Sequence, residues 1–310
     1  MNIYIDSTMD DRGRRSELYN GSLFVHSPSP SSVKLCQLAQ ELIEEAFRPL
    51  DPLKAQESLP VERCVTILAE LKPKFIHHPK SKEYIRGMLE DMRCDLDKTY
   101  FDVPRMRTAF PGDYLKSGIA YAFHPHRDTW YSAPSCQVNW WMPVYEIFAE
   151  NSMAFHPRYW DEAVPNDSDK YNYYEWNRVS RKSAAQHIGS DTRVQPHALA
   201  PLAPDPQVRL VTRIGQTTLF SGAQLHSTVP NSCDTTRFSI DFRTVHVDDL
   251  KGRRGAPNLD SACTGTTIHD YLRGSDYSRL PDEVVALYAD ATEANYVASP
   301  SALSESVERK

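Results

Sequence analysis

The stretch YAFHPHRDTWYSAP, residues 121–134, contains the pattern His126-Arg127-Asp128, and His226 follows in LFSGAQLHSTVPN, residues 219–231. Alternate side chains on a β-strand share a face, so His126 and Asp128 on one strand can bind one metal ion. Two imidazoles and one carboxylate leave the opposite positions of an octahedron open, which suits an Fe(II) centre that binds oxygen and an organic co-substrate. The pattern predicts that His126, Asp128 and His226 are metal ligands and catalytic residues, with Arg127 on the other face.

Arg237 is the candidate partner of that co-substrate. It lies in TTRFSIDFR, residues 235–243, after the turn-forming segment 230–232. Because this segment lets the chain reverse, a strand returning from Arg237 would bring its guanidinium beside the metal. Arginine binds a carboxylate through two parallel hydrogen bonds, which suits a dicarboxylate such as 2-oxoglutarate. Alternation along residues 237–243 predicts one polar and one apolar face, and a solvated charged face is the alternative.

Together these segments resemble the phytanoyl-CoA dioxygenase-like branch of the Fe(II)/2-oxoglutarate-dependent oxygenases, over roughly residues 100 to 245. RIGQTTLFSGAQLHSTVPNSCDTTR, residues 213–237, is similar to that family's glycine-led strand, metal-binding histidine, polar turn and 2-oxoglutarate-binding arginine. AENSMAFHPRYW, residues 149–160, resembles its Glu-Asn-Gly stretch, with Asn151 kept and Ser152 in place of glycine. The family's Pro-Gly-Ser-His segment is replaced by residues 156–159.

The resemblance implies the cofactors Fe(II), 2-oxoglutarate and O2. It implies that Arg237 binds the distal carboxylate of 2-oxoglutarate, that Thr228 hydrogen-bonds to it and that Trp141 lines its pocket. Ser239, on the same strand face as Arg237, is assigned to the same site. The implied activity is that of a dioxygenase that oxidises a C–H bond of a small molecule in secondary metabolism and releases succinate and CO2.

The carboxylate at Asp128 bears on the outcome of that reaction. In related halogenases a glycine or alanine at this position opens a coordination position for chloride, so the aspartate favours hydroxylation. Desaturation, cyclisation and epoxidation use the same triad and stay open. A metalloenzyme of the cupin type that uses the triad without 2-oxoglutarate is the alternative, and a binding or scaffold protein that has lost turnover is a third interpretation.

A protein kinase is excluded, although His-Arg-Asp is also the pattern of the kinase catalytic loop. That motif requires asparagine five residues after its aspartate, where this chain has Ala133, and no glycine-rich phosphate loop precedes it.

The expected fold class is mainly β with α: a double-stranded β-helix, or jelly-roll and cupin-like barrel, buttressed by N-terminal helices. Residues 1–98 form the helical region, with helices over residues 33–50 after a Ser31-Ser32 cap, over 61–71 and over 82–93, the last two separated by Pro73 and Pro79. Residues 99–250 form the catalytic core. Its expected strands lie in the runs TYFDV, GIAYAFH, CQVNWWMPV, RLVTRIG, TTLFSG and RFSIDF.

An aromatic-rich insert over residues 155–207 has no strand pattern and is expected to loop out of the core. As a lid it would exclude water from the metal, and a surface loop or dimer contact is the alternative. Residues 251–310 are expected to form loops, a helix near Pro281 to Glu293 and a flexible tail.

Composition predicts a single soluble structural domain: 310 residues, 40% hydrophobic and 25% charged. The net charge of −6 argues against nucleic acid as a partner, and a small-molecule substrate is expected instead. No apolar run reaches the roughly 20 residues of a membrane span, and the N-terminus lacks a signal-peptide pattern, so a cytoplasmic location is expected. Six scattered cysteines predict reduced thiols, and a homo-oligomer is compatible with the sequence.

Overall fold

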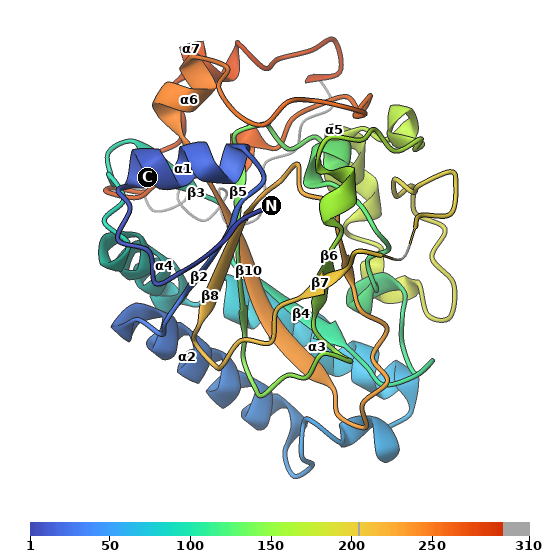
Figure 1. Ribbon diagram of the computed structural model, residues 1–310. Helices are drawn as coiled ribbons and strands as arrows, with labels where there is room; N and C mark the ends of the chain where they lie inside the picture. Colours follow the sequence, from blue (N-terminus) through green and yellow to red (C-terminus); the bar gives the residue numbers. More distant parts are fainter. Residues whose placement is uncertain (204, 294–310) are drawn as a thin grey trace, which may run out of the picture.

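The computed structural model describes residues 1–203 and 205–293. A large sheet has the strand order β1-β2-β8-β5-β10-β3-β11, with β4 also paired to β10, and a small sheet has the order β7-β6-β9 (Figure 1). The strands are β1 (Ile3–Ile5), β2 (Leu23–His26), β3 (Thr99–Phe101), β4 (Arg105–Ala109), β5 (Val138–Pro143), β6 (Met153–Phe155), β7 (Val208–Arg209), β8 (Thr217–Ser221), β9 (His226–Thr228), β10 (Arg237–His246) and β11 (Leu272–Arg273). The helices are α1 (Asp11–Tyr19), α2 (Pro30–Phe47), α3 (Val61–Ile76), α4 (Pro79–Asp91), α5 (Tyr173–Glu175), α6 (Val247–Lys251) and α7 (Asp282–Val285).

From β4 to β10 the chain passes repeatedly between the two sheets. β4, β5, β8 and β10 belong to the large sheet, and β6, β7 and β9 belong to the small one. An antiparallel bridge between His126 and His226 places the chain around residue 126 beside β9. The architecture is therefore a mixture of α and β with a large, mainly antiparallel sheet, as the expected fold class requires.

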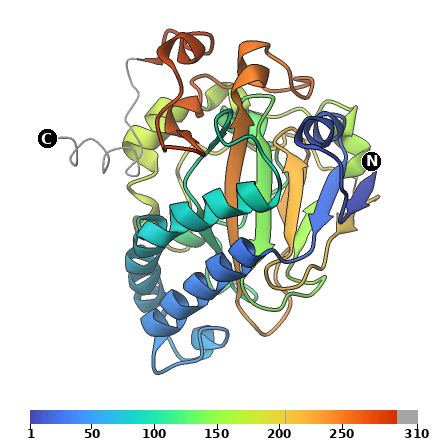
Figure 2. The ribbon, with the colours of Figure 1, turned by 90° about the vertical axis from the view of Figure 1, so that its left-hand side faces the viewer.

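Helices cover the outer face of the large sheet (Figure 2). Alternate residues of β5 and β10 point into a core shared with α2, α3 and α4; they are Trp140, Met142, Phe238, Ile240 and Phe242. The opposite face of β10 carries Arg237, Ser239, Asp241 and Arg243. Arg237 is only 5% exposed and Ser239 is fully buried. The two-faced pattern is confirmed, and the alternative of a solvated charged face is wrong.

The first long helix begins earlier than its sequence predicts. Ser29, not Ser31-Ser32, is the cap of α2, because its hydroxyl accepts from the Ser32 N–H and the Ser32 hydroxyl accepts from the Ser29 N–H. Such reciprocal capping satisfies two backbone donors. Pro30 then takes the first helical position, where no N–H is needed.

Pro73 lies inside α3 and does not end it, which corrects the expected boundary at Leu71. Proline in a helix interior costs about 3 kcal/mol, but Leu71 and Phe75 on either side of it are buried in the core. Burying such side chains contributes roughly 1.5–3 kcal/mol each, so packing offsets the proline. The next helix, α4, begins at Pro79 with His78 as its cap.

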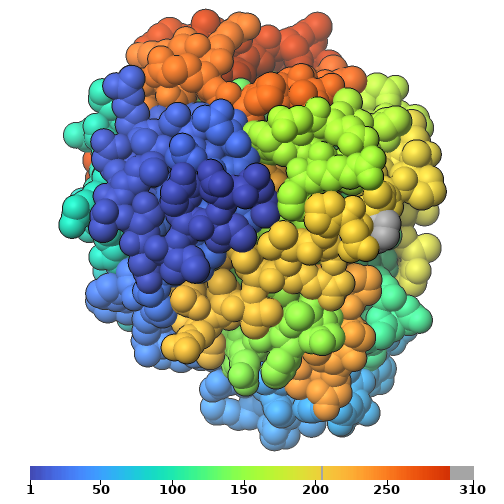
Figure 3. Space-filling model, in the orientation of Figure 1, coloured from blue at the N-terminus to red at the C-terminus, as the bar shows by residue number. Residues whose placement is uncertain are grey.

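The N-terminal region is not purely helical. β1 and β2 pair in parallel, and β2 pairs antiparallel with β8, so the first residues extend the large sheet. Figure 3 shows these residues beside the chain that leads into β8. Within that chain the Gly215 carbonyl accepts a hydrogen bond from the Ser32 hydroxyl of α2 at 2.7 Å. Short strands with few alternating residues carry little periodic signal.

Two of the expected strand runs are wrong. GIAYAFH begins with a 3-10 turn at Gly118–Ala120, where Gly118 has a φ of +58° and packs against the Ala184 carbonyl. RLVTRIG contributes only Arg209 to β7. The expected helix at 281–293 is reduced to α7 over Asp282–Val285, and the predicted flexible tail at 294–310 lies outside the described residues.

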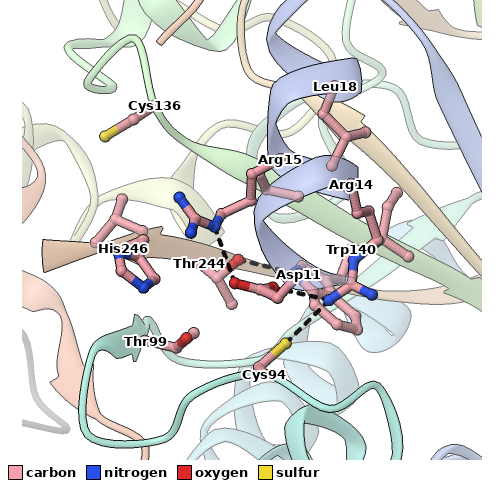
Figure 4. A pocket seen from close by; sticks show the side chains of 13 residues that line it. Asp11, Arg14, Arg15, Leu18, Cys94, Thr99, Cys136, Trp140, Thr244 and His246 are labelled. Carbon is pink, nitrogen blue, oxygen red and sulfur yellow. Dashed lines mark hydrogen bonds and ion pairs between the residues drawn. The ribbon is translucent and has the colours of Figure 1, made fainter. Parts of the chain in front are cut away.

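α1 packs on the outer face of the large sheet and encloses a cavity of about 10 Å³ there. Figure 4 shows the Asp11 carboxylate between Arg14 and Arg15, with Arg14 directed at Cys94. A volume of this size holds about one water molecule, so it is not a substrate site. The six cysteines are free thiols, and within the described residues no helix is long and apolar enough to cross a membrane.

Candidate metal centre

His126 and His226 face each other across a backbone bridge. Their N–H groups donate to each other's carbonyls at 2.9 and 3.0 Å, and their ring centroids lie 4.4 Å apart. Each ring is oriented by its Nδ1, which lies 2.8 Å from the His124 carbonyl and 2.9 Å from the Gln224 carbonyl, respectively. A ring that donates from Nδ1 keeps Nε2 free for a metal ion.

Asp128 completes the triad from a 3-10 turn, Asp128–Tyr131, and not from a strand. This corrects the expectation that one strand carries both ligands. The Asp128 N–H donates to the Gly222 carbonyl at 2.8 Å, which ties the turn to the end of β8. One ligand atom from each of His126, Asp128 and His226 lies within 4.8 Å of the others, and all three residues are buried. The structure therefore brings the predicted ligands together.

The electrostatics of the triad favour metal binding. Burial lowers the pKa of His226 to about 3, so its imidazole is neutral at pH 7. Burial alone would raise the pKa of Asp128, but the contact with His126 and the charge of Arg243 outweigh it and hold that pKa below its usual range. A neutral imidazole and an ionised carboxylate are the forms that bind a metal.

Arg127 points away from the triad, as expected, and ties the insert to the C-terminal segment. It is 2% exposed, forms an ion pair with Asp260 at 3.0 Å and donates to the carbonyls of Ala223, Tyr159 and Glu162. These contacts make it a structural residue.

Replacing Arg127 by methionine is expected to lower the free energy of unfolding by about 3–5 kcal/mol, since it leaves a buried carboxylate without its counter-charge. Urea denaturation followed by fluorescence measures the change. The matched control is Arg158→Met, because Arg158 forms an exposed ion pair with Glu162 and such pairs contribute about 0–1 kcal/mol. Equal stabilities of the two variants would contradict the assignment.

Arg237 lies on the inner face of β10, where it is 5% exposed. Its Nη1 donates to the Asn151 and Ser152 carbonyls at 3.1 Å, and within the described residues it forms no ion pair and its buried Nε has no hydrogen-bond partner. Burial and the charge of Arg107 lower its pKa to about 10, so it stays protonated at pH 7. A buried, unpaired cation is costly, and an anion bound beside it would remove that cost.

Of the three softer candidates, only Trp141 directly contacts this guanidinium within the described residues. Trp141 is buried, and Arg237 stacks over its ring at 5.9 Å. The Ser239 hydroxyl is buried, with no hydrogen-bond partner among the described residues. Thr228 is in β9 opposite Met153, and its neighbour Val229 donates to the same Ser152 carbonyl that Arg237 contacts. Binding of 2-oxoglutarate by these residues stays a prediction.

The insert approaches the metal through aromatic rings. The Tyr131 ring lies 5.3 Å from the His126 ring and 5.2 Å from that of Tyr171, which belongs to the insert. Tyr171 in turn contacts Trp176, whose ring lies under the Arg193 guanidinium at 4.9 Å. From residue 156 to 203 the described chain contains only short helical turns and bridges and no strand. Phe155, the first residue of the expected insert, belongs to β6, and the looping of the rest out of the core, like its role as a lid or an interface, stays a prediction.

Two residues near Asp128 were not predicted as site residues from the sequence. Gln137 donates to the Asp128 carboxylate at 2.8 Å, and the Arg243 Nε lies 3.8 Å from it. The polar residues Gln137 and Asn139 within the apolar run CQVNWWMPV could have indicated such contacts, because a polar side chain in a buried strand needs a hydrogen-bond partner.

The comparisons with known proteins give distant similarities. No family model matches the chain, and no curated protein matches it. Among solved structures, EvdO2 from Micromonospora carbonacea var. aurantiaca, also solved with 2-oxoglutarate, has 13% identity and a TM-score of 0.44, over 78% of this chain and 93% of that one. The non-heme alpha ketoglutarate dependent epimerase SnoN from nogalamycin biosynthesis has 15% identity and a TM-score of 0.39, over 87% of this chain and 100% of that one. EctD from S. alaskensis, solved with 2-oxoglutarate and 5-hydroxyectoine, has 13% identity and a TM-score of 0.37, over 78% of each chain. At these values function has to be inferred from the chain's own side chains.

Proposed function

We propose that this protein is an Fe(II)/2-oxoglutarate-dependent dioxygenase that hydroxylates a C–H bond of a small molecule. Two buried features together carry the proposal. One is the triad His126, Asp128 and His226, and the other is the guanidinium of Arg237, which forms no ion pair within the described residues. A metal site explains the first feature alone. A metal site that also binds a dicarboxylate explains both.

The donor set fits Fe(II). Two imidazoles and one carboxylate would hold the ion and leave its remaining positions open, as non-heme iron oxygenases need. When bound, Fe(II) with 2-oxoglutarate and O2 supplies the oxidising chemistry and releases succinate and CO2. Asp128 supports hydroxylation, because its carboxylate takes the position that a halide would need.

The chain's own residues bind and orient the reactants. Arg237 offers N–H donors to the distal carboxylate of 2-oxoglutarate, and its position is set by the Asn151 and Ser152 carbonyls. The Ser239 hydroxyl, buried two residues along β10, supplies a further donor, and Thr228 and Trp141 complete the pocket. Low exposure of these groups keeps water away, which strengthens each charged hydrogen bond.

The finer fold that supports this proposal is a double-stranded β-helix. The alternation of β4 to β10 between two sheets supports this fold, and His226 of the triad lies in the small sheet. We further propose that the insert at 155–207 closes over the substrate, since the Tyr131 ring contacts both the ring of Tyr171 in the insert and the ring of His126.

The alternative is a cupin-type metalloenzyme that uses the same triad without 2-oxoglutarate. Anaerobic addition of Fe(II) and 2-oxoglutarate to the purified protein distinguishes the two. A weak visible charge-transfer band is expected, and it requires that 2-oxoglutarate chelates the metal. Addition of succinate, which has no 2-oxo group, is the matched control and should give no band. A protein that binds Fe(II) but shows no band with 2-oxoglutarate would favour the alternative.

A further inference from the structure

The two carboxylate oxygens of Asp128 have different partners. Oδ1 lies 3.5 Å from the His126 Nε2 and therefore faces the metal position. Oδ2 accepts a hydrogen bond from the Gln137 Nε2 at 2.8 Å and lies at the longer distance of 3.8 Å from the Arg243 Nε. A carboxylate can bind a metal through one oxygen or through both, so the partner of Oδ2 bears on how many coordination positions Asp128 occupies.

All the hydrogen-bonding groups of the Gln137 side-chain amide nitrogen are used in this arrangement. It is 2% exposed, and its Nε2 donates both to Asp128 and to the Asn139 Oδ1, each at 2.8 Å. An amide nitrogen has two hydrogens, and both are used. A flipped amide would set its oxygen against two acceptor oxygens, so the network defines the orientation.

Tyr271 holds the other end of the amide. Its hydroxyl donates to the Gln137 Oε1 at 2.8 Å, and the residue is 1% exposed. Burial raises the pKa of Tyr271 well above its usual value, so the hydroxyl remains a donor. Tyr271 precedes β11 and packs with Val245 and Leu250 in a separate buried cluster. The C-terminal segment, for which the sequence predicts no chemical role, is thus linked to Asp128 by one intervening side chain, that of Gln137.

Gly222 keeps Gln137 and Asp128 together. Its carbonyl accepts from the Asp128 N–H at 2.8 Å, and its own N–H donates to the Gln137 carbonyl at 2.9 Å. A Cβ at this position would lie 3.2 Å from the Gln137 Nε2 and 3.5 Å from the Asp128 Cβ. The close approach leaves little room for either side chain to turn.

We propose that Gln137 and Tyr271 are positioning residues that hold Asp128 as a one-oxygen metal ligand, which keeps a coordination position open for the co-substrate. The inference rests on the proposed metal site and deepens it. With Oδ2 held by the amide, only Oδ1 is presented to the metal. Without that hydrogen bond the carboxylate can rotate and chelate, and it then takes a position that 2-oxoglutarate needs.

Cobalt(II) is the probe, because its visible absorption reports both binding and coordination number. Gln137→Leu is expected to weaken Co(II) binding by about 10- to 100-fold, the usual effect of removing an outer-shell partner. At saturating Co(II) its 2-oxoglutarate affinity is expected to fall as well, with a changed Co(II) spectrum. Tyr271→Phe removes one hydroxyl and is expected to cause smaller losses in the same direction.

Gln40→Leu and Tyr288→Phe are the matched controls. Gln40 donates to the Val144 carbonyl at 2.7 Å and Tyr288 to the Leu250 carbonyl at 3.0 Å, both away from the triad. Thermal denaturation of each variant shows whether it folds, and Tyr271→Phe decides the matter if Gln137→Leu does not. The inference would be overturned if the Gln137 and Tyr271 variants bound Co(II) and 2-oxoglutarate as the wild type does, or if the control variants lost as much affinity. Either result would leave the proposed function standing. A wild-type protein that binds no Co(II) would overturn the proposed function itself.

Discussion

Asp128→Ala is expected to abolish Fe(II)-dependent turnover of 2-oxoglutarate to succinate and to weaken Co(II) binding by more than the roughly 10- to 100-fold of an outer-shell change. The variant removes the only negatively charged group of the triad. The two imidazoles that remain bind a divalent ion without neutralising its charge. Succinate formation and Co(II) titration measure the two effects, and the titration is needed because an oxygenase without its substrate can be silent.

Asp128→Asn separates the effect of the negative charge of Asp128 from the effect of its side-chain shape. Asparagine keeps an oxygen that can accept from the Gln137 amide, so the fold should be retained, whereas its neutral side chain is a poor metal ligand. We therefore expect both variants to lose turnover, with Asp128→Asn closer to the wild type in thermal stability. Turnover at the wild-type rate in either variant would remove Asp128 from the site.

The proximity of the three candidate ligands could be predicted from the sequence, because each lies in a short pattern with a fixed order. His126 and Asp128 are two residues apart, and His226 precedes Arg237 by one polar turn. The local backbone geometry could not be predicted from the sequence. Asp128 lies in a 3-10 turn because its N–H donates to the Gly222 carbonyl, and this contact joins segments that are far apart in the chain. The strand prediction placed the carboxylate correctly although the element was wrong.

The supporting contacts were harder to predict, since they join residues that no periodicity relates. Gln137 and Tyr271 form a hydrogen bond although they are 134 residues apart in the chain, and the sequence around one gives no indication of the other. In the same way, packing of Leu71 and Phe75 carries α3 past Pro73, and short β1 and β2 extend the sheet without an alternating pattern. Tertiary packing, which local propensity does not contain, decided these features.

Arg237→Met is expected to weaken 2-oxoglutarate binding by about 2–5 kcal/mol, the usual loss when one partner of a buried charged hydrogen bond is removed. This corresponds to at least a tenfold rise in the dissociation constant, since 1.4 kcal/mol is tenfold. Co(II) binding should be unchanged, because Arg237 is not a metal ligand. Titration of the Co(II)-loaded protein with 2-oxoglutarate measures the first effect and Co(II) titration the second.

The same variant is expected to be as stable as the wild type, or more stable, when 2-oxoglutarate is absent. Arg237 is buried with no ion pair in the described chain, and its Nε has no hydrogen-bond partner there, so methionine removes an unfavourable desolvation. Saturating 2-oxoglutarate should then raise the melting temperature of the metal-loaded wild type, because a ligand that binds only the folded state stabilises it, but barely affect the variant. Arg209→Met is the control: Arg209 also donates to a backbone carbonyl, that of Ala149, yet is exposed. An Arg237→Met protein that 2-oxoglutarate stabilises as much as the wild type would show that the guanidinium does not bind the co-substrate.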